Sequence, residues 1–315
     1  MLEYTKKIRE IAERLLKEGK VDMVIGFRKG TLPMINEPHF VKRAEDVNEL
    51  YWDTFCAVNL ANYLTDRKER IAIVAKGCDS RNIVNHIIEN KVKKDKIVVI
   101  GVPCKGMLGR RKIALAAGGS EILEVIDGAK VTIKSKAGVK EVDRKDVTQD
   151  NCIICTHRNP VIYDELVAEK VEEQKNVDRY EDVKKIEAMS VQEKNEYFDT
   201  LLSTCIRCYA CRNACPLCYC PTCFVDESKP QWVGKSIEET DIKTFHFLRA
   251  YHCAGRCTDC GSCERVCPMN IKMRVLTKKL EKDCFDQFGW EAGLSLTERP
   301  PLDTYKPNDP QDFIK

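Results

Sequence analysis

The sequence lacks any apolar run that would cross a membrane. A spanning helix needs about 20 consecutive apolar residues, and no stretch of this 315-residue chain approaches that length. The first residues, MLEYTKKIREIAERLLKEGK, are charged throughout and contain none of the apolar core of a signal peptide. We therefore expect a cytoplasmic protein with no membrane span.

An excess of charge of one sign is also absent. The chain has 52 Lys and Arg against 49 Asp and Glu, a formal net charge of +3. A nucleic-acid-binding domain usually shows a clear basic excess. Metal-bound thiolates add negative charge, so the loaded protein would be acidic. We expect no nucleic-acid partner. The sequence also shows no acid–base or nucleophile arrangement that would predict a substrate site.

Cysteine, by contrast, is abundant. The chain has 18 cysteines, and 12 of them lie between Cys205 and Cys267. Apolar residues make up 43% of the sequence, enough for an ordinary core, so the cysteines do not replace one. Disulfides are uncommon in the cytosol, where clustered cysteines usually indicate metal or redox chemistry.

Two of the cysteine runs have the same spacing, and each ends in proline. The pattern Cys-x-x-Cys-x-x-Cys-x-x-x-Cys-Pro covers residues 205–216 and again residues 257–268. This is the bacterial ferredoxin signature, in which the fourth cysteine of a run binds the other cluster. It predicts two 4Fe–4S clusters: one on Cys205, Cys208, Cys211 and Cys267, the other on Cys257, Cys260, Cys263 and Cys215.

Zinc is the competing metal, because four thiolates are also its common structural ligands. Zinc sites usually combine two separate Cys-x-x-Cys pairs, so the repeated pattern favours iron and sulfide. A zinc-stabilised binding module remains an alternative from a different class of protein.

Four further cysteines lie in the same segment: Cys218, Cys220, Cys223 and Cys253. Three thiols within six residues and a distant fourth predict an additional centre, either a third 4Fe–4S cluster in this segment or zinc. The alternative is that they are buried small apolar residues.

The segments around both runs have helical patterns. Ser190 and Glu193 have capping-box spacing before the first run, and apolar residues follow on one helix face. Helices are expected before and after the second run, in DIKTFHFLRAYHC and IKMRVLTKKLEKDC. Residues 190–285 resemble the α-helical ferredoxin domain of the small iron–sulfur subunit of heterodisulfide reductases.

The N-terminal half alternates apolar strands with helices, which predicts an α/β domain with a parallel sheet. The expected first helix has Ile8, Ile11 and Leu15 on one face and Gly19 after its end. Strands are expected in VDMVIGF, IAIVAKG and KIVVIGV, with further helices in DVNELYWDTFCAVNLANYL and RNIVNHIIEN. A hairpin is expected in KVTIKSKAGVKEVDR.

Four cysteines of this half predict another cluster. Cys78 and Cys104 each follow a predicted strand, and Cys152 and Cys155 form a Cys-x-x-Cys pair. The carboxyl ends of neighbouring parallel strands meet at one edge of a sheet, where α/β proteins bind ligands. The cluster predicted there is held by Cys78, Cys104, Cys152 and Cys155. Cys56 and Cys284 are left over and are expected to have structural roles.

At the same residues the chain resembles the beta-subunit family of deazaflavin-coenzyme-dependent hydrogenases and dehydrogenases. The resemblance rests on AKGCDSRNI, VIGVPCKGM and CIICTHRNPVIYDEL and covers roughly residues 15–170. It implies a domain that binds flavin and one 4Fe–4S cluster. The first helix carries no glycine-rich phosphate cradle, so FAD near Cys78 and Cys104 is the alternative and not the main expectation.

These features predict four segments. They are an α/β cluster-binding domain (1–160), a charged helical linker (161–189), the ferredoxin domain with two or three clusters (190–285) and an extended partner-binding tail (286–315). In the tail, Phe288, Trp290 and Tyr305 are expected to anchor a partner.

The expected function is electron transfer in a cytosolic, anaerobic oxidoreductase complex, with this chain as a non-catalytic subunit. Family resemblance implies a hetero-oligomer. Its catalytic subunit would be of formate dehydrogenase, hydrogenase or carbon monoxide dehydrogenase type, and the electron partner heterodisulfide-reductase-like or a ferredoxin. The alternative is an FAD-containing subunit that exchanges hydride with a deazaflavin or nicotinamide coenzyme.

Overall fold

A computed structural model describes residues 2–303 of the chain. The described residues form two compact units, 2–80 with 92–177 and 81–91 with 178–303. The division passes through one helix, α2 (Gly77–Ile88).

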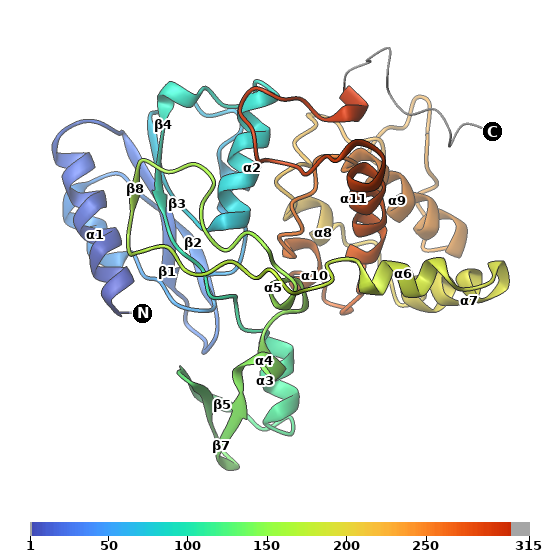
Figure 1. The fold of residues 1–315 in the computed structure, drawn as a ribbon, viewed down its shortest axis with the longest axis horizontal. Helices are drawn as coiled ribbons and strands as arrows, with labels where there is room; N and C mark the ends of the chain where they lie inside the picture. Colours follow the sequence, from blue (N-terminus) through green and yellow to red (C-terminus); the bar gives the residue numbers. More distant parts are fainter. Residues whose placement is uncertain (1, 304–315) are drawn as a thin grey trace. The chain divides into compact units, whose positions relative to one another are not determined.

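The first unit is built on a five-stranded sheet of order β2-β1-β3-β4-β8 (Figure 1). Its strands are β1 (Met23–Lys29), β2 (Asn36–Val41), β3 (Ile71–Ala75), β4 (Ile97–Gly101) and β8 (Glu165–Leu166). Four strands run parallel, and β2 pairs antiparallel with β1 at the edge. The sheet is therefore mixed, not purely parallel as the sequence predicts. Pro38 lies in β2, where an edge strand tolerates a residue without an N–H.

The first helix, α1 (Leu2–Lys17), confirms the sequence prediction. Ile8, Ile11 and Leu15 are buried on one face. After the helix, Gly19 has φ +62°, and the Lys20 N–H donates to the carbonyl of Leu15. A glycine in this left-handed conformation ends the helix without the strain that a Cβ would cause.

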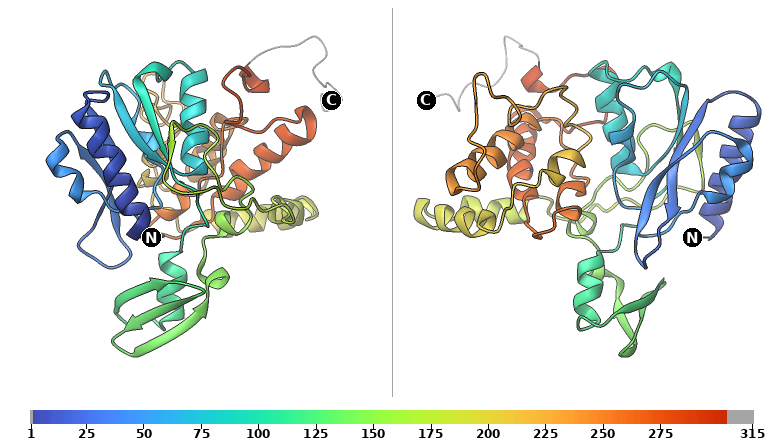
Figure 2. Two further views of the ribbon diagram at one scale, coloured as in Figure 1. Left: turned by 60° about the vertical axis from the view of Figure 1, so that its left-hand side comes forward. Right: turned by 180° about the vertical axis from the view of Figure 1, so that it is seen from behind.

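A second, smaller sheet stands apart from the first in both views of the chain (Figures 1 and 2). It is antiparallel and consists of β5 (Ile122–Asp127), β6 (Lys130–Ser135) and β7 (Gly138–Asp143). The predicted hairpin is β6–β7, in register from Lys130 with Asp143 to Ser135 with Gly138. The short helices α3 (Arg110–Ala116) and α4 (Arg144–Val147) pack against this sheet. The shared core has five buried residues: Leu108, Ile113, Val131, Ile133 and Val147.

The predicted helix in DVNELYWDTFCAVNLANYL is wrong. Only two 3-10 helices occur there, η1 (Ala44–Glu49) and η2 (Leu60–Tyr63). Between them the Asp53 side chain accepts from the Phe55 N–H, and the Asn59 side chain accepts from the Ala61 N–H. Such local side-chain hydrogen bonds offer the backbone an alternative to the helix.

The second unit is mainly helical. Its helices are α6 (Glu181–Glu187), α7 (Val191–Leu202), α8 (Ala210–Asn213), α9 (Glu239–His252), α10 (Ser262–Arg265), α11 (Arg274–Phe288) and the 3-10 helix η4 (Pro301–Asp303). The capping box is confirmed: Ser190 accepts from the Glu193 N–H, and the Glu193 carboxylate accepts from the Ser190 N–H. The helices predicted beside the second cysteine run are α9 and α11.

Residues 165–189 contain less helix than the sequence suggests. Glu165 and Leu166 form β8, and α6 alone is helical in that segment. Beyond α11, the Trp290 indole donates to the carbonyl of Gly255 at 2.7 Å, so this tail residue is held within its own unit. Tyr305 lies outside the described residues. Among residues 2–303, no helix has the length and apolar character to span a bilayer.

Candidate metal centres

The two ferredoxin-like runs adopt the same loop. In the first, Arg207 and Tyr209 have φ values of +49° and +58°. In the second, Asp259 and Gly261 occupy the equivalent positions, with φ values of +52° and +72°. Each run therefore places two left-handed residues between its first three cysteines.

Three of these four residues are not glycine, so the loops carry strain of about 1–2 kcal/mol per residue. A strained backbone conformation persists only where the surrounding structure holds it in place, and such positions cluster at ligand-binding sites. Successive right- and left-handed residues point their N–H groups into one concavity that binds anions, including iron–sulfur clusters. The Arg207 N–H, for example, lies 3.4 Å from the Cys205 sulfur.

The first centre brings together the predicted ligands from both runs. A small cavity is lined by Cys205, Cys208, Cys211 and Cys267. Burial raises the pKa of Cys205 and of Cys211, and Cys267 contributes to the raised pKa of both. Since Cys267 belongs to the second run, this is the exchange that the ferredoxin signature predicts.

His246 of α9 lies beside the same centre. Its Nε2 is 3.3 Å from the Cys205 sulfur. Burial and two arginines, Arg249 and Arg207, lower the pKa of His246 to about 4. The imidazole is therefore neutral near pH 7, and its N–H suits a hydrogen bond to a thiolate, a contact that tunes cluster potentials.

The second centre contains Cys257, Cys260 and Cys263, with Cys215 of the first run nearby. Burial raises the pKa of Cys260 and Cys263, and Cys215 raises both further. Cys257 is likewise buried, and Cys260 contributes to its raised pKa. A buried thiol with a raised pKa releases its proton when it binds a metal, because the thiolate is the ligand.

A charged network braces the second loop. Asp259 accepts from Arg274 at 2.5 and 2.8 Å and from Lys278 at 2.8 Å. Burial opposes ionisation, but the two cations hold the pKa of Asp259 well below its usual range. The network ties the left-handed residue of the loop to helix α11.

Arg249 of α9 is a buried cation without a carboxylate partner within residues 2–303. It is 4% exposed, and its guanidinium donates to the carbonyl of Cys211 at 3.1 Å. Burial alone would lower its pKa, yet four cysteines raise it well above the usual value: Cys215, Cys263, Cys253 and Cys211.

A buried arginine normally needs an anionic partner. In the part of the chain that the structure describes, the candidates are the cysteine sulfurs around it, which become anionic when they bind a cluster. Arg249 therefore fits thiolate-bound clusters and not neutral thiols.

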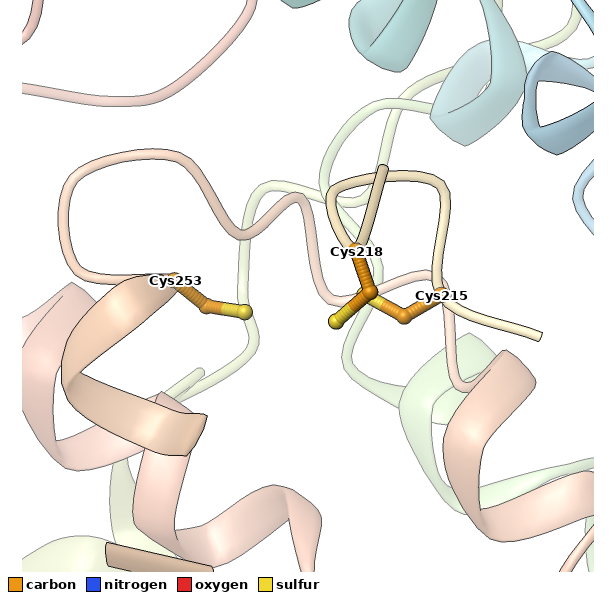
Figure 3. Close-up of side chains that lie close together, drawn as sticks. All are labelled: Cys215, Cys218 and Cys253. Atoms are coloured by element: carbon orange, nitrogen blue, oxygen red, sulfur yellow. The ribbon is translucent and has the colours of Figure 1, made fainter. Parts of the chain in front are cut away.

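Cys215 also lies in a group of three thiols. The sulfurs of Cys215, Cys218 and Cys253 are within 4.8 Å of one another (Figure 3). Cys215 and Cys218 come from one loop, and Cys253 points toward them from the end of α9. Hydrogen bonds from Cys215 and Cys253 lower the pKa of Cys218.

The other two cysteines of that predicted site are placed differently. Cys220 is exposed, and Cys223 interacts with the Arg212 side chain. Neither is part of the group formed by Cys215, Cys218 and Cys253 in the described chain.

In the first unit, Cys78 and Cys104 occupy equivalent positions. The parallel strands β3 and β4 pair Ala75 with Gly101, and each cysteine follows three residues later. The prediction that these strands are neighbours is confirmed. Burial, together with Cys152 and Cys155, raises the pKa of Cys104 to about 12. Cys152 lies in the short helix α5 (Asp150–Ile153).

Two glycines permit the close approach of these segments. A Cβ on Gly77 would lie 2.1 Å from the carbonyl oxygen of His157, two residues after Cys155. A Cβ on Gly106 would lie 3.3 Å from the Cβ of Cys152, and Gly106 has φ +95°. Both strand-end turns thus require glycine where they meet the Cys-x-x-Cys segment.

A cavity of about 350 Å³ borders Cys104. Its lining includes Tyr4, Trp52, Lys105 and Arg144. The Arg144 guanidinium is already bound to Asp127 and to the carbonyls of Lys105 and Gly106. The volume falls in the range of small-molecule sites.

The remaining cysteines are buried. Cys56 is fully buried and accepts from Asn36 Nδ2 and the Asp53 N–H, each at 3.3 Å. Cys284 lies in α11 and is 5% exposed. These contacts are consistent with the structural roles expected for both.

The profile of the family described as a 4Fe-4S dicluster domain matches residues 201–271. That range contains both duplicated loops and the buried Arg249. The chain is an iron–sulfur protein of the electron-transfer class.

Its relatives carry more specific names. The chain is 26% identical, over 91% of its own length and 91% of the relative's, to the "F420-dependent formate dehydrogenase subunit beta" of Methanocaldococcus jannaschii. It is 27% identical, over 91% of its length and 90% of the relative's, to the "F420-dependent formate dehydrogenase 1 subunit beta" of Methanococcus maripaludis. The resemblance to beta subunits of deazaflavin-coenzyme-dependent dehydrogenases is confirmed.

One solved structure is also similar, a chain of the F420-reducing NiFe hydrogenase complex from Methanosarcina barkeri. The identity is 16% and the TM-score 0.37, over 50% of this chain and 62% of the hydrogenase chain, less than two thirds of its length. This likeness is too low to define the fold.

Proposed function

We propose that the protein is the iron–sulfur electron-transfer subunit of an anaerobic formate-oxidising complex. The observation that carries the proposal is the duplicated left-handed loop, whose N–H groups suit anionic clusters. Buried Arg249 of α9 supplies a counter-charge beside both loops. The names of both curated relatives favour a formate dehydrogenase as the catalytic partner. A hydrogenase or carbon monoxide dehydrogenase is the less favoured partner.

In this function the ligands are those of the ferredoxin signature. Cys205, Cys208, Cys211 and Cys267 hold the first cluster, and Cys257, Cys260, Cys263 and Cys215 the second. Cys78, Cys104, Cys152 and Cys155 hold a third in the first unit. Each cluster supplies one-electron redox chemistry. The protein's own residues bury the sulfurs, donate hydrogen bonds to them and provide counter-charge. Electrons then pass to a heterodisulfide-reductase-like or ferredoxin partner.

The test is the iron content and spectrum of the anaerobically purified chain. Three clusters require about twelve iron atoms and a broad brown absorption. Co-purification with a tagged formate dehydrogenase catalytic subunit tests the partner separately. A colourless protein with bound zinc would contradict the proposal and support the zinc-stabilised module.

A second function is favoured by the cavity beside Cys104. An FAD bound there would lie next to the third cluster and would exchange hydride with a deazaflavin or nicotinamide coenzyme. Flavin fluorescence after acid denaturation tests this reading. One flavin per chain supports a hydride-handling subunit, and none leaves a relay of clusters alone.

A further inference from the structure

The ferredoxin signature accounts for only one of the three sulfurs that meet near the second centre. Cys215 is its fourth ligand, whereas Cys218 and Cys253 fall outside both runs. Yet the three sulfurs lie within 4.8 Å of one another. Two thiols therefore adjoin a cluster ligand without a ligand role of their own.

Metal binding does not explain this group well. A single tetrahedral metal needs a fourth ligand, and within residues 2–303 no other His, Cys, Asp or Glu joins the three. A cubane binds each thiolate through a different iron, so its ligands stand farther apart than those of one metal. The spacing and the ligand number fit a pair of thiols beside a cluster ligand.

The two thiols are also held in place by one network. Arg256 binds Glu89 at 2.5 and 3.0 Å and donates to the Tyr219 hydroxyl at 2.5 Å, which fixes the residue after Cys218. The same guanidinium donates to the carbonyl of His252 at 2.9 Å, next to Cys253. A single arginine thus positions both chain segments.

We propose that Cys218 and Cys253 form a redox-active dithiol that closes to a disulfide beside the second cluster. The proposal rests on the proposed function, because it takes Cys215 as a cluster ligand. The dithiol can hold two electrons, whereas each cluster carries one. A hydride or formate donor delivers two electrons at a time, so the dithiol matches such a donor to the clusters.

Oxidation breaks two S–H bonds, forms one Sγ–Sγ bond and releases two protons and two electrons. Two one-electron acceptors of the iron–sulfur class take one electron each, and the reverse step reduces the disulfide. The two sulfurs, now within 4.8 Å, must close to about 2.05 Å. Cys218 lies in a loop and Cys253 at the end of α9, so neither cysteine is within a helix or a strand.

The test measures whether Cys218 and Cys253 are thiols or a disulfide in the iron-loaded chain, after equilibration at a series of fixed redox potentials. Samples are quenched with acid, alkylated under denaturing conditions, digested and mapped by mass spectrometry. We expect a Cys218–Cys253 linkage that follows a two-electron curve, a tenfold change for every 30 mV or so. Exposed Cys220, two residues from Cys218, is the internal control and should be alkylated at every potential.

Cys218→Ser and Cys253→Ser should each abolish the linkage and leave the iron content at the wild-type level. Cys284→Ser is the control and should keep both the linkage and the iron content. Three results would overturn the proposal: no linkage at any potential, a loss of about four irons in either serine variant, or one zinc per chain that both variants lose. Failure of the proposed function is distinguishable, because it appears as missing iron in the wild-type chain.

Discussion

The guanidinium of Arg249 donates a hydrogen bond to the carbonyl oxygen of Cys211, 3.1 Å away, from a site that is 4% exposed. Cys211 belongs to the first centre. Cys215 and Cys263 belong to the second, and they also raise the pKa of Arg249. One buried cation therefore acts on both proposed clusters.

Replacing Arg249 should shift both cluster potentials together. Arg249→Met removes a positive charge that stabilises the reduced, more negative clusters, so both potentials should fall. A tenfold change in the reduction equilibrium corresponds to about 59 mV for one electron. Arg249→Lys should retain most of the wild-type values. Anaerobic titration followed by electron paramagnetic resonance measures both.

Arg212→Met is the matched control, since Arg212 adjoins Cys211 but is partly exposed and pairs with the exposed carboxylate of Asp226 at 2.7 Å. Its potentials should stay near wild type. A shift of one cluster alone in Arg249→Met would show that the cation is not shared.

The exchange of the fourth cysteine predicts which cluster a substitution removes. Cys267→Ser lies in the second run but should remove the first cluster, about four irons, with the same spectroscopic loss as Cys208→Ser. Cys208 is exposed, so its substitution carries little risk to folding. Cys284→Ser should keep the full iron content. Loss of the second cluster's signal in Cys267→Ser would refute the exchange.

Asp259 should matter more for stability than any surface carboxylate. Asp259→Asn removes the carboxylate that buried Arg274 and Lys278 share, which should cost up to about 3–5 kcal/mol. The carboxylates that remain to them, Glu264 and Glu281, lie farther away, at 3.6 and 3.8 Å. Asp286→Asn in α11 is the control, because the exposed Lys282–Asp286 pair should contribute less than about 1 kcal/mol. Anaerobic denaturant unfolding measures both, and equal effects would contradict the prediction.

The contribution of Asp259 to the free energy of unfolding should also depend on pH. Its folded pKa is lowered, so the unfolded chain takes up the proton first as the pH falls. The stability from Asp259 is thus fully present above its unfolded pKa, about 3.9, and is lost as the pH falls through the lower folded value. The wild-type advantage over Asp259→Asn should therefore be constant from pH 6 to 8 and shrink only in strong acid.

Gly77→Ala should disrupt the third centre. The new Cβ would meet the backbone carbonyl of His157 at 2.1 Å, and that backbone cannot move without displacing the segment of Cys155. We expect the loss of about four irons with the other two clusters intact. Gly109→Ala is the control, since its Cβ meets its nearest atom at 3.4 Å. An unchanged iron content in Gly77→Ala would argue against a cluster at Cys155.

Local spacing makes much of this chain predictable from its sequence. The two cysteine runs, the capping box at Ser190 and the glycine after α1 depend on residues only a few positions apart. The alternation of strands and helices likewise predicts that β3 and β4 are neighbours, which brings Cys78 and Cys104 to equivalent positions.

Features that depend on distant contacts could not be found in this way. β8 has two residues, too few for a periodic pattern, and exists because β4 offers it a partner edge. Cys253 meets Cys218 through folding, not spacing. The position of Arg249 could have been read from the sequence. It follows Phe245 by four residues and so lies on the same, apolar face of its helix, which indicates a buried cation that needs an anion.

The exchange of Cys215 and Cys267 between the two loops has a consequence for biosynthesis. In the proposed assignment, neither loop contains a complete ligand set. During synthesis the first cluster therefore lacks its fourth ligand until Cys267 of the second loop has emerged from the ribosome. Cluster insertion must therefore wait until nearly the whole protein has left the ribosome. A truncated product would expose incomplete thiol sets and be open to early degradation.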